Sequence, residues 1–171
     1  MSGGAVTLPA PVDTAALRAA FGQFATGVTV ITADAGSPSG MTANSFTSLS
    51  VDPPLALVCV ARGAAMHESV LRAGAFGINI LSAEQESCAR YFADHGRPRG
   101  RAEFDGIAWQ PGARTRAPLL TDALAWLECR LVTVHEGGDH SIFVGEAVGF
   151  AQRHEGEALV FHRGRFGRLA A

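Results

Sequence analysis

Short strand-like segments recur along the whole chain, and a turn signal bounds each one. Residues 28–33, 55–61 and 76–81 are rich in β-branched or apolar side chains, and residues 123–136 alternate apolar and polar positions. Both patterns are typical of β-strands. Glycine, proline and aspartate separate the segments at hairpin spacing, which favours antiparallel pairing. The sequence therefore predicts a mainly β fold with flanking helices, a closed or split antiparallel barrel rather than a parallel α/β sheet.

Two later segments complete the predicted barrel. Residues 141–152 form a long strand in which Gly145 and Gly149 indicate bulges or close backbone approach, and residues 158–166 form the last strand. Residues 55–61 are continuously apolar, so we expect this strand at the centre of the sheet, buried on both faces.

Helices are predicted at the ends of the strands. A first helix, from Asp13 to about Ala25 and ended by Gly27, would place Leu17, Phe21 and Phe24 on one apolar face. These three apolar residues recur at helical spacing, and Asp13 or Thr14 can cap the start of the helix. We expect this helix to act as a lid or brace.

Further helices are predicted after two of the strands. Residues 66–73 form a short helix ended by Gly74, and another helix begins at Ser82, where Gln85 completes a capping box. Residues 94–117 contain arginines, glycines and prolines without clear periodicity, so we expect a long loop there.

The length and composition predict one domain. A chain of 171 residues with 47% hydrophobic side chains can bury one continuous core and is too short for two ordinary domains. Residues 1–12 contain little that can pack, so they are expected to form a mobile N-terminal arm. Residues 13–171 are expected to form the single domain.

Charge and cysteine content narrow the class of protein. A formal net charge of -2 provides no basic field for nucleic acid, so none is expected as a partner. Cys59, Cys88 and Cys129 are odd in number and lie in apolar sequence, which indicates reduced core thiols in a cytoplasmic protein. No signal peptide or membrane-spanning run is recognisable, so no association with membranes is expected.

Several enzyme classes lack their motifs in this chain. The sequence has no GxGxxG after a strand, no Walker loop, no HExxH, no CxxC and no GxSxG elbow. His135 and His140 flank a turn with Asp139, but too few further ligands accompany them for a metal site. We therefore expect no bound metal.

Residues 40–61 join two apolar strands through small hydroxyl and amide side chains. Thr42, Asn44 and Ser45 interleave with apolar residues such as Met41. This mixture is typical of the floor of a pocket for a polar-headed ligand. Ordinary strand and turn hydrogen bonding is the alternative interpretation, and the residues alone do not identify a ligand.

The chain contains, in this order, the blocks TGVTVIT, GMTANSFTSLSVDPPLALVC, FGINIL, LAWLEC, GGDHSIFVGE and LVFHRGRF. Over residues 15–166 this order resembles the short-chain flavin reductases. These are reductase components of two-component flavin-dependent monooxygenases, similar to the reductase component of 4-hydroxyphenylacetate 3-monooxygenase and to those of natural-product oxygenases. The resemblance implies an FMN-binding split barrel, usually a homodimer. It also implies an NAD(P)H-dependent enzyme that reduces FAD or FMN and releases the reduced flavin to a partner monooxygenase.

The resemblance further implies which residues contact the flavin. They are Met41, Thr42, Ala43, Asn44, Ser45, Ser48, Leu49, Ser50, Cys59, Val60 and Ala61. An isoalloxazine ring needs an apolar slot with fixed dipoles, because the reduced flavin gathers negative charge. Cys59 is expected to contact the ring and not to act as a nucleophile, since nothing nearby in the sequence would lower its pKa.

The segment after the cysteine strand departs from the family pattern. Many relatives carry Ser, Thr or Asn there to hold the flavin phosphate, whereas this chain reads RGAAMH over residues 62–67. The phosphate is therefore expected at the backbone N–H groups that begin the 66–73 helix, with Arg62, His67 or Arg97 assisting. A solvated loop is the alternative for Arg97 and its neighbouring arginines.

A second site is implied for the nicotinamide nucleotide. Its residues are His140, Arg163, Gly164, Arg165 and Phe166. The alternatives are a surface-turn histidine and a charged strand end. Hydride transfer between the two bound rings requires no protein acid or base, so the predicted role of the protein is to position them. The sequence does not choose between FAD and FMN or between NADH and NADPH, and NADH is taken as the default nucleotide.

Two other functions remain possible on this fold. One is a split-barrel flavoprotein that holds its flavin tightly and acts on another substrate. The other is a non-catalytic barrel that binds flavin or haem.

Overall fold

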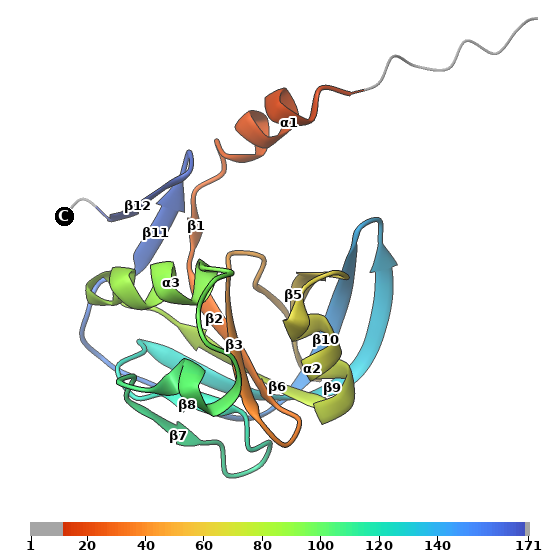
Figure 1. The fold of residues 1–171 in the computed structure, drawn as a ribbon, viewed down its shortest axis with the longest axis vertical. Helices are drawn as coiled ribbons and strands as arrows, with labels where there is room; N and C mark the ends of the chain where they lie inside the picture. The colour runs from red at the N-terminus through yellow and green to blue at the C-terminus, as the bar shows by residue number, and fades with distance from the viewer. Residues whose placement is uncertain (1–11, 170–171) are drawn as a thin grey trace, which may run out of the picture.

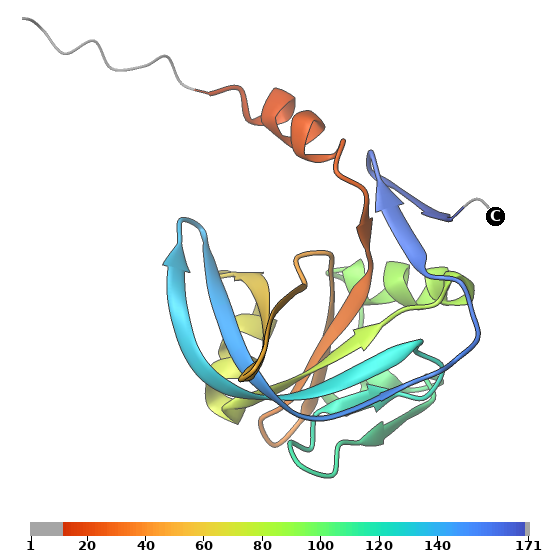
Figure 2. The same ribbon diagram turned by 180° about the vertical axis from the view of Figure 1, so that it is seen from behind.

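The computed structural model describes residues 12–169, in which a strongly curved antiparallel sheet forms a barrel with helices outside it (Figures 1 and 2). The main sheet has seven strands in the order β3-β2-β6-β9-β10-β5-β4. Their bounds are β2 (Thr29–Asp34), β3 (Pro38–Ala43), β4 (Thr47–Val51), β5 (Pro54–Ala61), β6 (Ala75–Ile80), β9 (Ala125–Gly137) and β10 (His140–Gln152). The predicted mainly β, antiparallel class is confirmed. The predicted arm lies outside the described residues except for Val12.

The barrel is split between β3 and β4. These strands are the two edges of the sheet, yet residues 44–46 alone join them in the chain. So short a connection spans at most about 14 Å, which forces the sheet to roll until its edges approach. Ser45 fixes this connection on β5, because its hydroxyl donates to the Cys59 carbonyl (2.9 Å) and accepts from the Cys59 N–H (3.0 Å).

Smaller sheets and the helices surround the barrel. A three-stranded sheet contains β1 (Thr26–Gly27), β11 (Leu159–His162) and β12 (Arg165–Arg168), and a two-stranded sheet contains β7 (Trp109–Pro111) and β8 (Pro118–Leu120). The α-helices are α1 (Thr14–Phe21), α2 (Ala65–Ala73) and α3 (Glu86–Ala93), and the short 3-10 helices are η1 (Ala83–Gln85) and η2 (Gly100–Phe104). The predicted capping box of Ser82 and Gln85 is present at the start of η1.

Two hydrophobic clusters lie on opposite faces of the sheet. One fills the barrel and includes Ile31, Val58 and Phe76, and the other packs under α3 and includes Val30 and Phe92. Strand β2 contributes to both clusters, and five consecutive residues are buried in β2 and in β6, so these strands are buried on both faces.

The predicted position of residues 55–61 is wrong. This strand, β5, lies next to the edge strand β4, and its buried residues alternate with partly exposed ones. The side chains on its partly exposed face are apolar as well, so the continuous apolar run does not reflect burial on both faces.

The first helix ends earlier than predicted. It begins at Asp13, whose carboxylate accepts from two backbone N–H groups, but it ends at Phe21 with Gly22 as the cap. The Arg163 N–H donates to the Gly22 carbonyl (2.9 Å), and the chain then enters β1, so tertiary contacts end the helix. Its apolar face is exposed, with Phe21 at 69% and no residue of the helix buried.

The last predicted strand is in fact a hairpin. Strands β11 and β12 pair around Arg163 and Gly164, which have φ of 50° and 74°. Positive φ at both central positions is the geometry of a two-residue hairpin turn, and arginine rarely adopts it. The bulges predicted at Gly145 and Gly149 are confirmed, because the register between β9 and β10 shifts at both glycines.

The described part of the chain contains no helix long and apolar enough to cross a membrane. Over the same residues, Cys59, Cys88 and Cys129 are free thiols, as the sequence predicted, but of the three Cys129 alone is buried in the core.

Candidate functional site

A cavity of about 690 Å³ lies between β3, the start of α2 and the loop that follows α3. This volume is within the roughly 300–1,000 Å³ of typical small-molecule sites. Met41, Thr42 and Ala61 form one part of its wall, and residues 63–66 form another. The cavity therefore includes some of the residues that the resemblance assigns to the flavin, namely Met41, Thr42, Ala61 and Arg97.

The N-terminus of α2 opens onto this cavity. Its N-cap residue, Ala64, provides no side-chain hydrogen bond, and Gly63 and Ala65 are small enough to leave the backbone accessible. The first N–H groups of a helix and its dipole together attract anions. The arrangement can bind a phosphate without the hydroxyl side chains that the sequence lacks.

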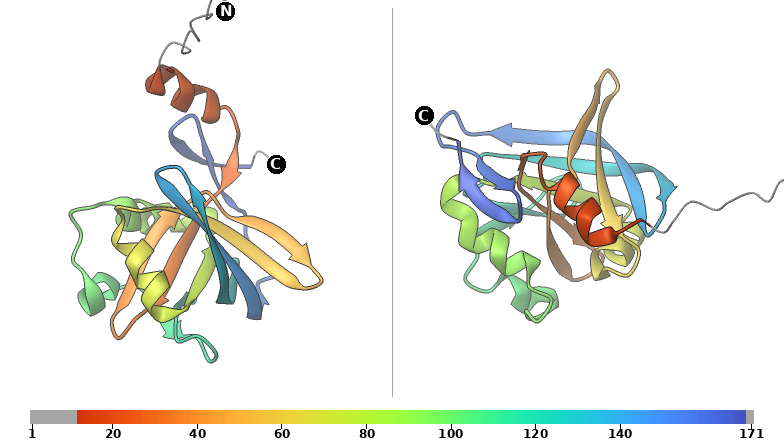
Figure 3. Two further views of the ribbon diagram at one scale, coloured as in Figure 1. Left: turned by 90° about the vertical axis from the view of Figure 1, so that its right-hand side faces the viewer. Right: turned by 90° about the horizontal axis from the view of Figure 1, so that it is seen from above.

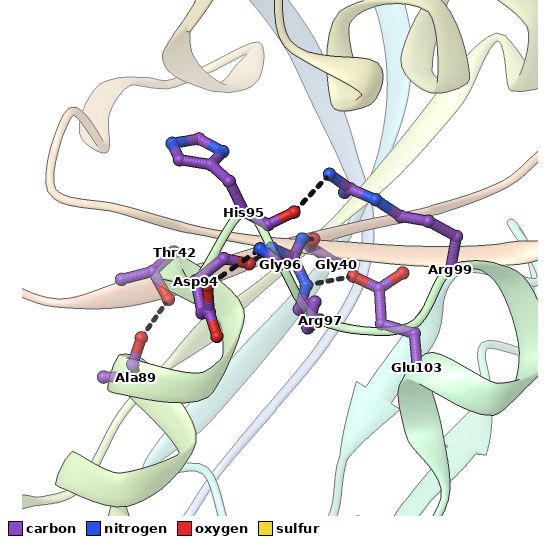
Figure 4. Close-up of polar contacts among 9 residues, drawn as sticks. All are labelled: Gly40, Thr42, Ala89, Asp94, His95, Gly96, Arg97, Arg99 and Glu103. Carbon is purple, nitrogen blue, oxygen red and sulfur yellow. Dashed lines mark hydrogen bonds and ion pairs between the residues drawn. The ribbon is translucent and has the colours of Figure 1, made fainter.

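A buried ion pair fixes the opposite wall (Figure 4). Arg97 Nε donates to Glu103 Oε1 at 2.5 Å, and its two terminal nitrogens donate to the carbonyls of Asp94 and Gly40. Gly40 must be glycine here, because a Cβ would lie 2.4 Å from the ring of Phe92. The pair therefore holds the loop after α3 against β3.

Glu103 has a second carboxylate oxygen with a different environment. Oε2 is buried and has no hydrogen-bond partner in the described part of the chain, and Glu103 as a whole is 1% exposed. An unsatisfied buried acceptor costs about 1–3 kcal/mol. Such an oxygen requires an explanation, and Glu103 lines the cavity.

The side-chain hydroxyls of two residues predicted to contact the flavin form hydrogen bonds within the protein. Thr42 Oγ1 donates to the Ala89 carbonyl of α3 at 2.6 Å, and Ser45 bonds Cys59 across the split. Ala43 and Asn44 lie beside them at the end of β3, and Asn44 is exposed. The predicted β4 residues, Ser48, Leu49 and Ser50, lie on the far side of the same split, exposed or partly exposed.

The side chains of three residues predicted to contact the flavin are engaged within the protein. Val60 is fully buried in the barrel core. His67 Nε2 lies 2.8 Å from the Ser141 hydroxyl, and its ring packs edge-on against Phe143. Arg97 is neither solvated nor free to bind a phosphate, because Glu103 and two carbonyls occupy its guanidinium. We therefore no longer expect direct ligand contacts from these side chains.

The predicted nucleotide residue His140 lies beside Ala61, which lines the cavity. It pairs with Ala61 across the ladder between β10 and β5, and the Arg62 N–H donates to the Asp139 carbonyl at 3.0 Å. His140 Nδ1 lies 2.7 Å from Asp139 Oδ1, and the hydrogen bond and charge of His140 lower the pKa of Asp139. Asp139 thus fixes the orientation of the imidazole.

The other predicted nucleotide residues form a separate cavity. Arg163, Arg165 and Phe166 line a space of about 620 Å³ at the β11–β12 hairpin. The Arg163 guanidinium donates twice to Gln23 Oε1, at 2.9 and 2.6 Å. In both Figures 1 and 2 this hairpin lies on the opposite side of the barrel from the β9–β10 turn, so one chain does not bring these residues to His140.

The surroundings of the three cysteines disfavour the thiolate form. Burial raises the pKa of the Cys59 thiol, so it stays protonated at neutral pH. Burial and nearby carboxylates raise the pKa of Cys88 to about 11 and that of Cys129 to about 12. Over residues 12–169, no three His, Cys, Asp or Glu side chains gather as a metal site would require.

The loop after α3 contributes cavity residues that sequence reasoning did not assign. His95, Arg99 and Glu103 line the cavity, as do Ser37 and Ser39 at the start of β3. The arginines of residues 94–117 were the one sequence feature that pointed to a role for this loop. An irregular loop has no helical or strand periodicity, so the sequence does not show which of its side chains point inward.

Comparison with known proteins identifies the class. Residues 21–170 match the flavin reductase like domain family. The chain is 47% identical over 160 residues to an NADH-dependent FAD reductase of Streptomyces globisporus, covering 94% of this chain and 88% of that protein. It is 38% identical to the reductase subunit of a flavin-dependent monooxygenase of Rhodococcus jostii, covering 95% and 81%.

A solved structure gives the same result. The flavin reductase component of a bacterial two-component tryptophan halogenase superposes with a TM-score of 0.89 at 50% identity, covering 93% of this chain and 99% of that one. The fold is therefore that of the split-barrel flavin reductases. The chain belongs to the flavin reductase like domain family.

Proposed function

We propose that this chain is an NADH-dependent flavin reductase that takes FAD or FMN as a substrate and delivers the reduced flavin to a partner monooxygenase. The observation that carries the proposal is the cavity between β3 and the uncapped start of α2, with His140 beside Ala61 of its wall. The names of the similar reductases support the same reaction. Family resemblance by itself would leave the residues of the site unassigned.

In this proposal the phosphate of the flavin lies at the backbone N–H groups that begin α2. The isoalloxazine ring then extends toward the split, along Met41, Thr42 and Ala61 of the cavity wall and toward the partly exposed Cys59. The backbone and hydroxyls of β4 supply the dipoles that stabilise the negative charge of the reduced ring.

His140 positions the nicotinamide nucleotide against this ring. The reaction passes a hydride from NADH to the flavin and takes up a proton, giving NAD⁺ and the reduced flavin. The protein holds the two rings face to face and excludes water, which is the main contribution of an enzyme to a direct transfer. No residue of the described site has to donate or remove a proton.

We further propose that the active form is a homodimer. The β4–β5 hairpin projects from the barrel (Figure 3) and exposes Leu49 and Val51, the latter by 92%. Helix α1 exposes Phe21, and Phe24 in the segment after the helix is exposed as well. Exposed apolar side chains on projecting elements favour burial against a second copy. Light scattering that finds only monomer at micromolar concentration would contradict this.

The proposal also implies a cellular compartment for the protein and a weakly held flavin. Free thiols and the absence of a membrane-crossing helix in the described residues are compatible with a cytoplasmic enzyme. A reductase that supplies a second protein must release its flavin, so the purified protein should lose yellow colour on gel filtration. Retained colour would favour a flavoprotein that acts on another substrate.

A further inference from the structure

One side-chain hydrogen bond, formed by His67, joins the first turn of α2 to the barrel. Its Nε2 lies 2.8 Å from the hydroxyl of Ser141 on β10. The hydroxyl of Ser69, also on α2, donates to the Ala65 carbonyl and so stays within the helix. The N-cap residue Ala64 forms no side-chain hydrogen bond. Within residues 12–169, His67 is therefore the one side chain of α2 that hydrogen-bonds to the sheet.

The imidazole of His67 is fixed on two sides. Besides the contact with Ser141, the ring packs edge-on against Phe143, with the ring centroids 5.1 Å apart and an interplanar angle of 74°. Phe143 is fully buried and Ser141 is 6% exposed, so both partners belong to the tightly packed part of β10. A ring held by a hydrogen bond and by an aromatic contact has one preferred orientation.

Ser141 is the direct neighbour of His140 on β10. The two residues lie opposite Val60 and Ala61 of β5. Successive side chains of a strand point to opposite faces. Ser141 is therefore buried toward α2, whereas His140 is partly exposed on the other face. A shift of Ser141 moves the backbone that carries His140.

His67 does not line the cavity, whereas residues 63–66, immediately before it, do. These residues include the helix start to which the flavin phosphate is assigned. The connection between the two ligand positions is short: the helix start leads to His67, and Ser141 leads to His140. His67 thus joins the flavin side of the site to the nucleotide side without contacting either ligand.

We propose that His67 is a positioning residue, which fixes the start of α2 relative to β10 and thereby the distance between the bound flavin and the bound nicotinamide. This inference rests on the proposed function. Hydride transfer depends steeply on the separation of the two rings, and a misplacement of about 1 Å can slow a reaction about 100-fold. Each ligand keeps its own binding surface, so His67 governs the rate of transfer more than either affinity.

The test follows flavin reduction by NADH in a single turnover without oxygen, with enzyme in excess over FAD. In His67→Ala the rate constant of flavin reduction at saturating NADH should fall about tenfold, while Kd for FAD and for NADH changes less than about threefold. His67→Gln, whose amide can still reach the Ser141 hydroxyl, should recover most of the rate. Arg72→Ala is the matched control, since Arg72 is exposed on the same helix and does not line the cavity. The control should change none of these values.

A second variant removes the other partner of the hydrogen bond. Ser141→Ala deletes only a hydroxyl, and it should lower the same rate constant as His67→Ala does. The double variant should lose no more than His67→Ala alone, because both changes break one interaction. Losses that simply add would show that the two residues act separately, and would overturn the inference.

The rate constant separates positioning from a loss of fold. It does not depend on how much of the protein is folded, whereas the amplitude of the single turnover does. A lower amplitude with an unchanged rate constant in His67→Ala would show a purely structural role and overturn the inference. If His67→Ala does not fold, Ser141→Ala decides: a slower transfer supports the inference, and an unchanged one overturns it.

Failure of the proposed function gives a different result. An unmodified protein that reduces neither FAD nor FMN with NADH would overturn the proposed function and this inference with it. Normal reduction by the unmodified protein, with no change in the rate constant of either variant, would overturn the role of His67 alone.

Discussion

His140 lies directly opposite Ala61 in the antiparallel ladder between β10 and β5. Ala61 ends β5 and is followed within four residues by α2, whose start offers N–H groups to an anion. One pair of strands therefore places the predicted nicotinamide contact beside the predicted flavin phosphate. This relationship links the two halves of the proposed reaction.

The first prediction concerns His140. Replacement of His140 by Ala removes a hydrogen-bonding group beside the cavity wall and should raise KM for NADH about tenfold. Flavin affinity should stay within about twofold, since the imidazole does not line the cavity. Steady-state kinetics and a flavin titration measure both quantities. If flavin binding collapses while KM for NADH stays unchanged, the two sites have been assigned the wrong way round.

The second prediction tests the start of α2 as the phosphate site. Ala64→Asp supplies the missing helix cap, which should stabilise the fold by about 1 kcal/mol. The added carboxylate also repels a phosphate, so flavin affinity should fall at least about tenfold. Ala64→Ser is the control, because it caps the helix without charge. Flavin binding that is equal in the two variants would place the phosphate elsewhere.

The third prediction concerns the buried pair of Arg97 and Glu103. Arg97→Met leaves a buried carboxylate unpaired and should lower the free energy of unfolding by about 3–5 kcal/mol. The double variant Arg97→Met with Glu103→Leu should recover much of this loss, and Arg101→Met should cost less than about 0.5 kcal/mol. Urea denaturation measures all three. An unchanged stability of Arg97→Met would mean that the pair does not hold the loop.

The fourth prediction is a loss of stability in alkali. The pKa of Cys129 is raised from 9.0 to about 12, so the folded thiol stays protonated where the unfolded one ionises. Because a raised pKa stabilises the fold only below the unfolded value, stability should fall as pH rises from about 9 toward 12. Cys129→Ala should show a flatter decline over this range than the unmodified protein. Parallel declines in denaturation series would rule out the thiol as a cause.

Much of the fold could be predicted because its signals are local. The capping box of Ser82 and the bulges at Gly145 and Gly149 depend on neighbouring residues, and they were identified correctly. The hairpin at Arg163 was missed, since arginine seldom adopts positive φ. The order of strands is a property of the whole chain, so the apolar content of β5 could not show that it lies next to an edge.

The site was less predictable than the fold. Met41 and Thr42 were identified through the resemblance, and both line the cavity. The pairing of Arg97 with Glu103 joins two residues of an irregular loop, and only the folded chain shows that this arginine is occupied.

The most direct test of the central claim is NADH oxidation by the purified protein with free flavin, followed as loss of NADH absorbance. We expect many turnovers per enzyme with added FAD under air, because oxygen regenerates the flavin, and formation of reduced flavin when oxygen is excluded. A protein that binds flavin but consumes no NADH with either FAD or FMN would contradict it.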